Sequence, residues 1–113
     1  MNDRQSTKKR PAAKKALKSI VEKLKNGYQP ESIILFGSLA QERITDSSDI
    51  DLIVVKKTKK DPWSRLREAD QYLDHKFPVD FLVYTPQEIK QRKKMGDPFV
   101  EDFLEKGKIV YEK

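Results

Sequence analysis

Three short apolar segments constrain this chain more than any other feature. They are residues 32–36, 50–55 and 79–84, and they are rich in β-branched residues. Gly37 follows the first segment, two lysines follow the second and Pro78 precedes the third, as is typical of buried strands. The segments around them repeat apolar residues at helical spacing. The pattern therefore predicts a small sheet with helices packed on it.

Helical spacing and proline positions define the remaining elements. Apolar residues recur at i, i+3, i+4 and i+7 from Ala12 onward and predict a helix that ends near Gly27. A second predicted helix begins at Pro62, with Asp61 as its cap, and runs to Phe77. Two shorter helices are predicted from Pro86 to about Lys94 and from Pro98 to Gly107, and an edge strand over residues 108–111.

Charge divides the chain of 113 residues into two parts. Residues 1–25 sum to +7 and the rest to −1, which together give the net charge of +6. Residues 1–11 offer nothing to bury, so we expect a disordered basic arm, followed by a single domain over residues 12–113. Because the body of the domain is close to neutral, we do not expect nucleic acid to be its main partner. An RNA-binding module that uses the arm is one hypothesis, but we rank it below the two given at the end of this section, because aromatic residues are not interleaved with the basic ones.

Composition also bears on the compartment. The chain has no cysteine, which excludes a disulfide framework and a thiolate zinc site and fits a cytoplasmic protein. No apolar run approaches the roughly 18 residues that span a membrane. The amino terminus lacks the apolar stretch of a signal peptide, so we expect neither a membrane nor a secreted protein.

Two acids at one strand end carry the strongest chemical signal. Asp49 and Asp51 are two residues apart, so their side chains face the same side of a strand. Their mutual repulsion is relieved by a divalent cation such as Mg²⁺, which prefers carboxylate and phosphate oxygens. Asp80 lies inside the third strand, and if the strands are neighbours it completes a cluster for two metal ions. The alternative is structural: Asp49 caps a turn, Asp51 faces solvent on an edge strand, and Asp80 pairs with a lysine.

A Gly-Ser pair follows the first strand. Gly37 lets the backbone approach a phosphate, and the hydroxyl of Ser38 and the free N–H groups of a following helix bind its oxygens. Ser48 either donates a hydrogen bond to the same site or caps the entry to the strand. Gly-Ser alone is also ordinary turn chemistry. Its specificity comes from the acids that follow at a fixed distance.

The chain resembles the minimal nucleotidyltransferases of the DNA polymerase beta superfamily. The residues that carry the resemblance are Leu35-Phe36-Gly37-Ser38, ten further residues, and then Asp49-Ile50-Asp51-Leu52, with Val79-Asp80-Phe81 as the third-acid segment. The resemblance covers about residues 12–113 and implies an α+β fold, a small mixed sheet flanked by helices. It implies transfer of a nucleotide, commonly AMP from ATP, with Mg²⁺. Gly37 and Ser38 would hold the triphosphate, Asp49 and Asp51 would bind two metal ions, and Asp80 would complete the site and help to activate the attacking hydroxyl.

The resemblance also implies a partner. Many similar proteins belong to toxin–antitoxin pairs with an all-helical HEPN protein, and some adenylylate that partner. Our first hypothesis is an antitoxin that transfers AMP from ATP to a protein hydroxyl, with the HEPN protein or a second copy of the chain completing the site. The alternative is a catalytically inactive antitoxin that masks the HEPN protein.

Several other residues have structural explanations. Trp63 matches a helical stripe, so we expect it in the core, and we expect His75 to be an ordinary surface or helix-end residue. The lysines after the second strand are interpreted as a solvated turn, with contact to a partner or phosphate as the alternative: Lys56, Lys57, Lys59 and Lys60.

Overall fold

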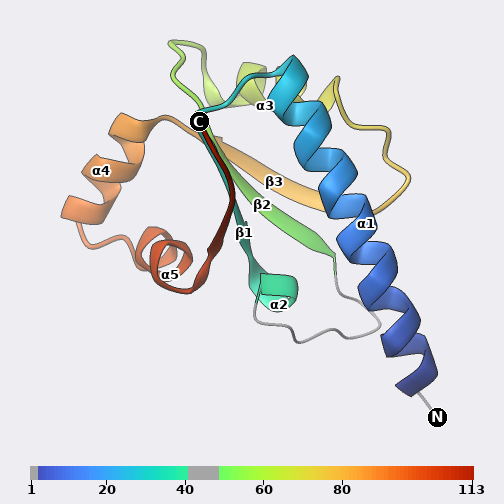
Figure 1. Ribbon diagram of the computed structural model, residues 1–113. Coiled ribbons are helices and arrows are strands. Elements are labelled where there is room, and N and C mark those ends of the chain that lie inside the picture. The colour runs from blue at the N-terminus through green and yellow to red at the C-terminus, as the bar shows by residue number, and fades with distance from the viewer. Residues whose placement is uncertain (1–2, 41–48) are drawn as a thin grey trace.

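The computed structural model describes residues 3–40 and 49–113. Figure 1 shows its helices and strands in chain order. The helices are α1 (Asp3–Gly27), α2 (Gly37–Ala40), α3 (Pro62–Asp70), α4 (Pro86–Lys94) and α5 (Pro98–Lys106). The strands are β1 (Ser32–Phe36), β2 (Ile50–Val55), β3 (Val79–Tyr84) and β4 (Lys108–Glu112). In this part of the chain no helix combines the length and apolarity that crossing a membrane requires.

The strands form one mixed sheet in the order β3-β2-β1-β4. β1 pairs antiparallel with β2 and with β4, whereas β2 and β3 are parallel. Parallel neighbours need a crossover connection, and α3 supplies it between β2 and β3. The predicted α+β fold with a small mixed sheet is confirmed.

Side chains that alternate along the strands build a core on each face of the sheet. Ile33 and Leu35 of β1 join the core under α1 and α3, while Ile34 joins the core under α5. In Figure 1, α1 and α3 lie on one side of the sheet and α4 and α5 on the other. Because β2 lies inside the sheet, apolar residues on both of its faces are fully buried, which explains its nearly continuous apolar sequence.

Two predicted helix boundaries are wrong. α1 begins at Asp3 rather than Ala12, inside the segment expected to be a disordered arm, because lysine, arginine and glutamine have good helix propensity and can extend a helix without burying apolar groups. α3 ends at Asp70 and not at Phe77. Leu73 and Phe77 still pack against the core, but from a loop, which needs no helical spacing.

One residue of α3 lies elsewhere than the sequence predicts. Trp63 is 72% exposed, so the expectation that it packs in the core is wrong. A helix of only nine residues presents one narrow stripe to the sheet, and Arg65 and Ala69 occupy it. His75 lies outside any helix, with a positive φ of 60°, and contacts Asp70 at the surface.

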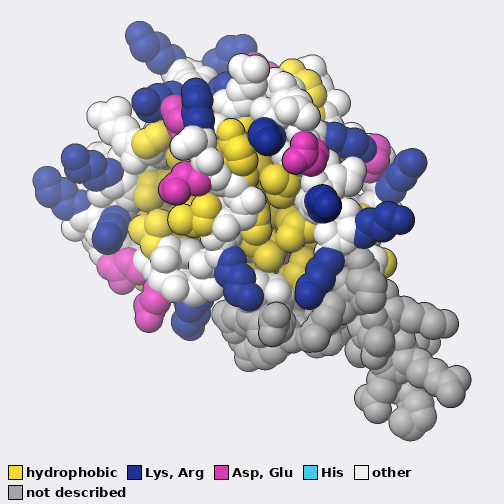
Figure 2. All heavy atoms as spheres, in the orientation of Figure 1, with side chains coloured by type: hydrophobic (Ala, Val, Ile, Leu, Met, Phe, Trp, Pro, Cys, Tyr) yellow, Lys and Arg dark blue, Asp and Glu magenta, His cyan; other side chains and the backbone are white. Residues whose placement is uncertain are grey.

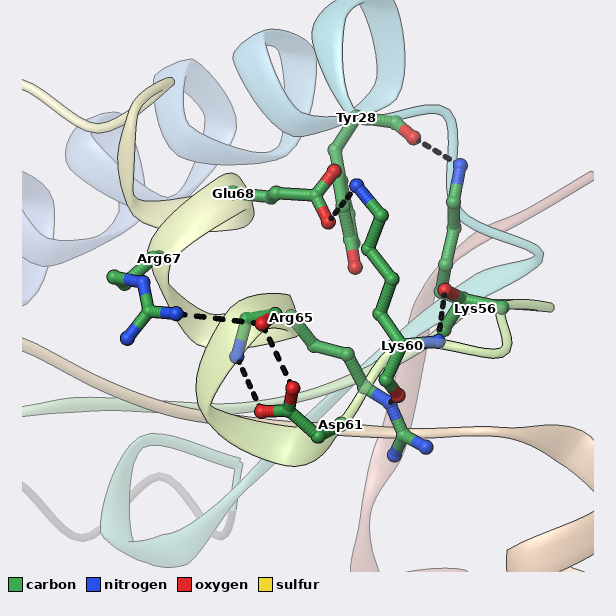
Figure 3. A network of polar contacts seen from close by, with 9 residues as sticks. Tyr28, Lys56, Lys60, Asp61, Arg65, Arg67 and Glu68 are labelled. Carbon is green, nitrogen blue, oxygen red and sulfur yellow. Dashed lines mark hydrogen bonds and ion pairs between the residues drawn. The ribbon is translucent and has the colours of Figure 1, made fainter.

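A polar network fixes the start of α3. Asp61 caps the helix, as predicted, by accepting a hydrogen bond from the N–H of Ser64 at 3.0 Å. Figure 3 shows this cap next to the ion pair of Lys60 and Glu68, which are 3.0 Å apart. The network joins α3 to the turn after β2 and so sets where the helix crosses the sheet.

Arg65 carries the buried charge of this region. Its side chain extends from α3 and is only 7% exposed. The guanidinium donates to the carbonyl of Lys60 at 2.7 Å, to Glu88 at 2.7 Å and to the carbonyl of Val83 at 3.4 Å. A buried charge with a carboxylate and two carbonyls around it is well satisfied, so Arg65 ties α3, α4 and β3 together.

Candidate functional site

Two of the predicted acids are direct neighbours in the sheet. Asp51 of β2 is in register with Asp80 of β3, and the two strands are parallel. Residues in register on adjacent strands point to the same face and lie about 5 Å apart. Asp51 is half-buried and Asp80 is exposed, so the pair lies at the border between core and solvent.

Asp49 adds a third negative charge. It immediately precedes β2 and is half-buried. The pKa of Asp51 is raised above its ordinary value, first by burial and then by the charges of Asp80 and Asp49. The charges of the two neighbouring acids thus disfavour the ionised form of Asp51, as expected for carboxylates brought together.

The structural alternative for the acids is not supported. Asp51 lies on an interior strand of the sheet, not on an edge. None of the ion pairs formed between described residues involves Asp49, Asp51 or Asp80. Within residues 3–40 and 49–113, no basic side chain neutralises these acids.

Gly37 lies directly against Asp51. Phe36, which precedes it, is in register with Asp51, and Gly37 turns the chain into α2 with a φ of +78°. A side chain at this position would adopt a strained backbone conformation and would collide with the carboxylate of Asp51. The backbone at Gly37 therefore lies close to the Asp51 carboxylate, with Ser38 next in the chain. Ser48 lies outside the described residues.

The donor chemistry fits Mg²⁺. Within residues 3–40 and 49–113, no three histidine or acidic side chains are close enough to hold a metal ion by themselves. Mg²⁺ rarely requires such a cage, because it usually takes one or two carboxylates and completes its shell with water and substrate phosphates. Asp51 and Asp80 offer such a pair, and the backbone of Gly37 lies against one of the two carboxylates.

The lysines after β2 serve the fold. Lys56 donates a hydrogen bond to the carbonyl of Tyr28 at 2.6 Å, and Lys57 lies 3.5 Å from Glu31. These residues follow the end of β2 opposite to Asp51. Figure 2 shows basic side chains spread around the visible face rather than gathered in one patch. The solvated turn is the better interpretation of this segment.

Sequence reasoning missed a groove that leads to Asp80. It lies between α3 and the first half of β3, and its lining residues are Trp63, Leu66, Arg67, Asp70, Val79, Asp80 and Phe81. Helical spacing assigned Trp63 to the core, and only its packing in three dimensions shows that the ring lines a surface groove.

Comparison with known proteins shows which family the chain belongs to. Residues 18–113 match the family described as Polymerase beta, Nucleotidyltransferase. The chain belongs to this family. The nucleotidyltransferase is 32% identical over 99 residues to a Methanocaldococcus jannaschii protein named "Putative protein adenylyltransferase", and the match covers 86% of this chain and 96% of that one. The predicted family is therefore confirmed.

A solved structure supports the fold. It is described as a "putative nucleotidyltransferase" from Sulfolobus solfataricus, with a TM-score of 0.70 and 22% sequence identity to this nucleotidyltransferase. The match covers 96% of this chain and 87% of that one. At this identity the likeness bears on the arrangement of the sheet and helices.

Proposed function

We propose that this nucleotidyltransferase transfers AMP from ATP to a hydroxyl of a partner protein, with Mg²⁺ bound at Asp49, Asp51 and Asp80. The observation that carries the proposal is the approach of Gly37 to the Asp51 carboxylate, with Asp80 in register beside it. Phosphate-binding backbone and metal-binding carboxylates thereby share one end of the sheet. Nucleotidyl transfer requires that arrangement.

In this mechanism the chain acts by positioning and by charge. The backbone at Gly37 and Ser38 binds the triphosphate and orients its α-phosphorus toward the incoming hydroxyl. Bound Mg²⁺ would neutralise the negative charge of the phosphates. The hydroxyl oxygen forms a bond to the α-phosphorus, the bond to the bridging oxygen breaks, and pyrophosphate leaves. Asp80, which is more exposed than Asp51, takes up the hydroxyl proton.

A protein acceptor is supported by the relative whose name describes a protein adenylyltransferase, which matches most of both chains. The small size of the domain points the same way, because a chain of 113 residues that holds phosphate and metal has little surface left for the acceptor, and a partner protein would supply the missing wall. We propose that a HEPN-type helical protein is the acceptor and that modification neutralises it, which makes this chain an antitoxin.

The assignment of the acids is tested by substitution. We expect Asp49→Asn and Asp51→Asn to abolish transfer of labelled AMP while the circular dichroism spectrum stays that of the wild type. Asp102→Asn is the matched control, since Asp102 lies on the surface of α5 and its ion-pair partner among the described residues is Lys106 of the same helix. Transfer at the wild-type rate by Asp49→Asn or by Asp51→Asn would contradict the proposed metal site.

The acceptor is tested by mass spectrometry. The chain is mixed with the HEPN-type protein, ATP and Mg²⁺, and we expect the partner to gain the mass of AMP only when all components are present. If the partner binds tightly but gains no mass, the chain is an inactive antitoxin, and the proposed transfer is wrong.

A further inference from the structure

The outer edge of β3 exposes backbone groups beside Asp80. The carbonyl of Pro78 accepts from the N–H of Ile50 at 3.2 Å, and the carbonyl of Tyr84 accepts from the N–H of Lys56 at 2.9 Å. The N–H and C=O groups of successive residues alternate in direction along a strand. Every second residue from Pro78 to Tyr84 therefore directs its backbone hydrogen-bonding groups toward β2. The residues between them direct their N–H and C=O groups away from the sheet: Val79, Phe81 and Val83.

Arg65 covers only one half of this edge. Its guanidinium donates to the carbonyl of Val83, as the alternation requires, and is itself held by Glu88. Among the described residues, Val79 and Phe81 have no hydrogen-bond partner on the outer side. An open edge of this kind is a template for another extended chain.

The groove described above borders that open half. Trp63 lies along it and is 72% exposed, while Leu66 and Phe81 are half-buried in its walls. Tryptophan in such a position is a frequent anchor of protein interfaces, because its ring buries a large area at little entropic cost. The groove therefore borders the backbone groups of Val79 and Phe81 that have no partner among the described residues, and it presents the ring of Trp63. Asp80 of the candidate site is one of its lining residues.

We propose that the acceptor protein binds here through an extended segment that adds to the sheet beside β3; the inference rests on the function proposed above. The repeat of outward N–H and C=O groups every second residue matches a peptide backbone, whereas a nucleotide has no such repeat. A side chain across from Asp80 in the added strand points to the face that carries Asp51 and Asp80. That residue of the acceptor carries the modified hydroxyl.

Two variants test the docking edge. Trp63→Ala removes the exposed anchor. Val79→Pro removes an outward N–H at the first residue of an edge strand, where proline is tolerated. We expect each to raise the KM for the acceptor protein at least about tenfold, with kcat little changed in Trp63→Ala. Met95→Ala and Ile109→Ala are controls, because both residues are highly exposed and lie outside the groove.

Hydrogen exchange tests the same edge without a substitution. In ¹⁵N-labelled wild-type protein, addition of the acceptor protein without ATP should slow exchange of the Val79 and Phe81 amides at least about tenfold, as pairing to a new strand requires. The amide of Leu82, which faces β2, serves as the internal reference.

Each outcome decides between the two proposals. A labelled acceptor with unchanged KM in both variants, or with unchanged exchange at Val79 and Phe81, overturns the docking inference and leaves the transfer function intact. Slow exchange with no transfer by wild-type protein contradicts the proposed function while the docking edge stands. Protection of the same amides in the protein alone, together with a dimer in sedimentation, makes a second copy the occupant and overturns the assignment to an acceptor.

Discussion

Replacing Asp51 with asparagine should stabilise the protein while it abolishes transfer. The carboxylate of Asp51 is half-buried and faces the charges of Asp80 and Asp49, and these are the causes of its raised pKa. A raised pKa means that the folded state holds the proton more tightly than the unfolded state does. Ionisation of Asp51 therefore lowers the free energy of unfolding, progressively as pH rises from about 4 to the raised value.

The magnitude follows from the register of the two strands. Two unit charges about 5 Å apart repel by about 0.8 kcal/mol in water and by about 3 kcal/mol at an effective dielectric constant of 20. Because Asp80 is exposed, the lower part of this range applies, and we expect Asp51→Asn to raise the free energy of unfolding by about 1 kcal/mol. For a domain near this size, such a change raises Tm by about 4 °C.

Thermal unfolding at several pH values measures the effect. The gain should be full at pH 7, should shrink in 1 M NaCl because salt screens the repulsion, and should vanish near pH 3, where wild-type Asp51 is protonated. Added Mg²⁺ should stabilise the wild type and not the variant. Asp102→Asn should change Tm little in all conditions. Equal or lower stability of Asp51→Asn at pH 7 would refute the reasoning, because it would show that the carboxylate has a stabilising partner.

Three further predictions concern the surroundings of the site. Gly37→Ala should lower the free energy of unfolding by more than Gly96→Ala. Gly96 shares the φ of +78°, but a Cβ there would meet only a side-chain oxygen of Glu101 at 4.0 Å. Urea denaturation of both variants tests this difference, and only Gly37→Ala should lose transfer. Arg65→Met should cost about 3 kcal/mol in urea, because it leaves a carboxylate unpaired. Burial raises the pKa of Glu88, but the hydrogen bond and charge of Arg65 together with the hydrogen bonds of Thr85 hold it below its usual value. Wild type should therefore lose stability as pH falls below about 4, and Arg65→Met should lose less. Phe103→Ala should cost about 3–5 kcal/mol, measured by the same denaturation, since Phe103 is 1% exposed; a smaller loss would show that the core under α5 is loosely packed.

Local sequence pattern predicted most of the elements. The strands β1, β2 and β3 lie at the predicted residues, because their apolar runs end at glycine, proline or charged residues that cannot continue a buried strand. Proline at the first helical position located the starts of α3, α4 and α5 for the same kind of local reason. The motif also identified the glycine that the structure places against a carboxylate, since only glycine tolerates both the positive φ and the close approach at Gly37.

The order of the strands was decided only in three dimensions. Asp51 and Asp80 are far apart in the sequence, and no spacing rule states that β3 pairs with β2 in register. Local pattern also overestimated the length of α3 and buried Trp63, because apolar residues at helical spacing can equally reach a core from a loop, as Leu73 and Phe77 do. The sequence alone therefore identified the residues that we propose carry the chemistry. The packing of α3 against the edge of the sheet decided which acids meet, and it left an open strand beside them.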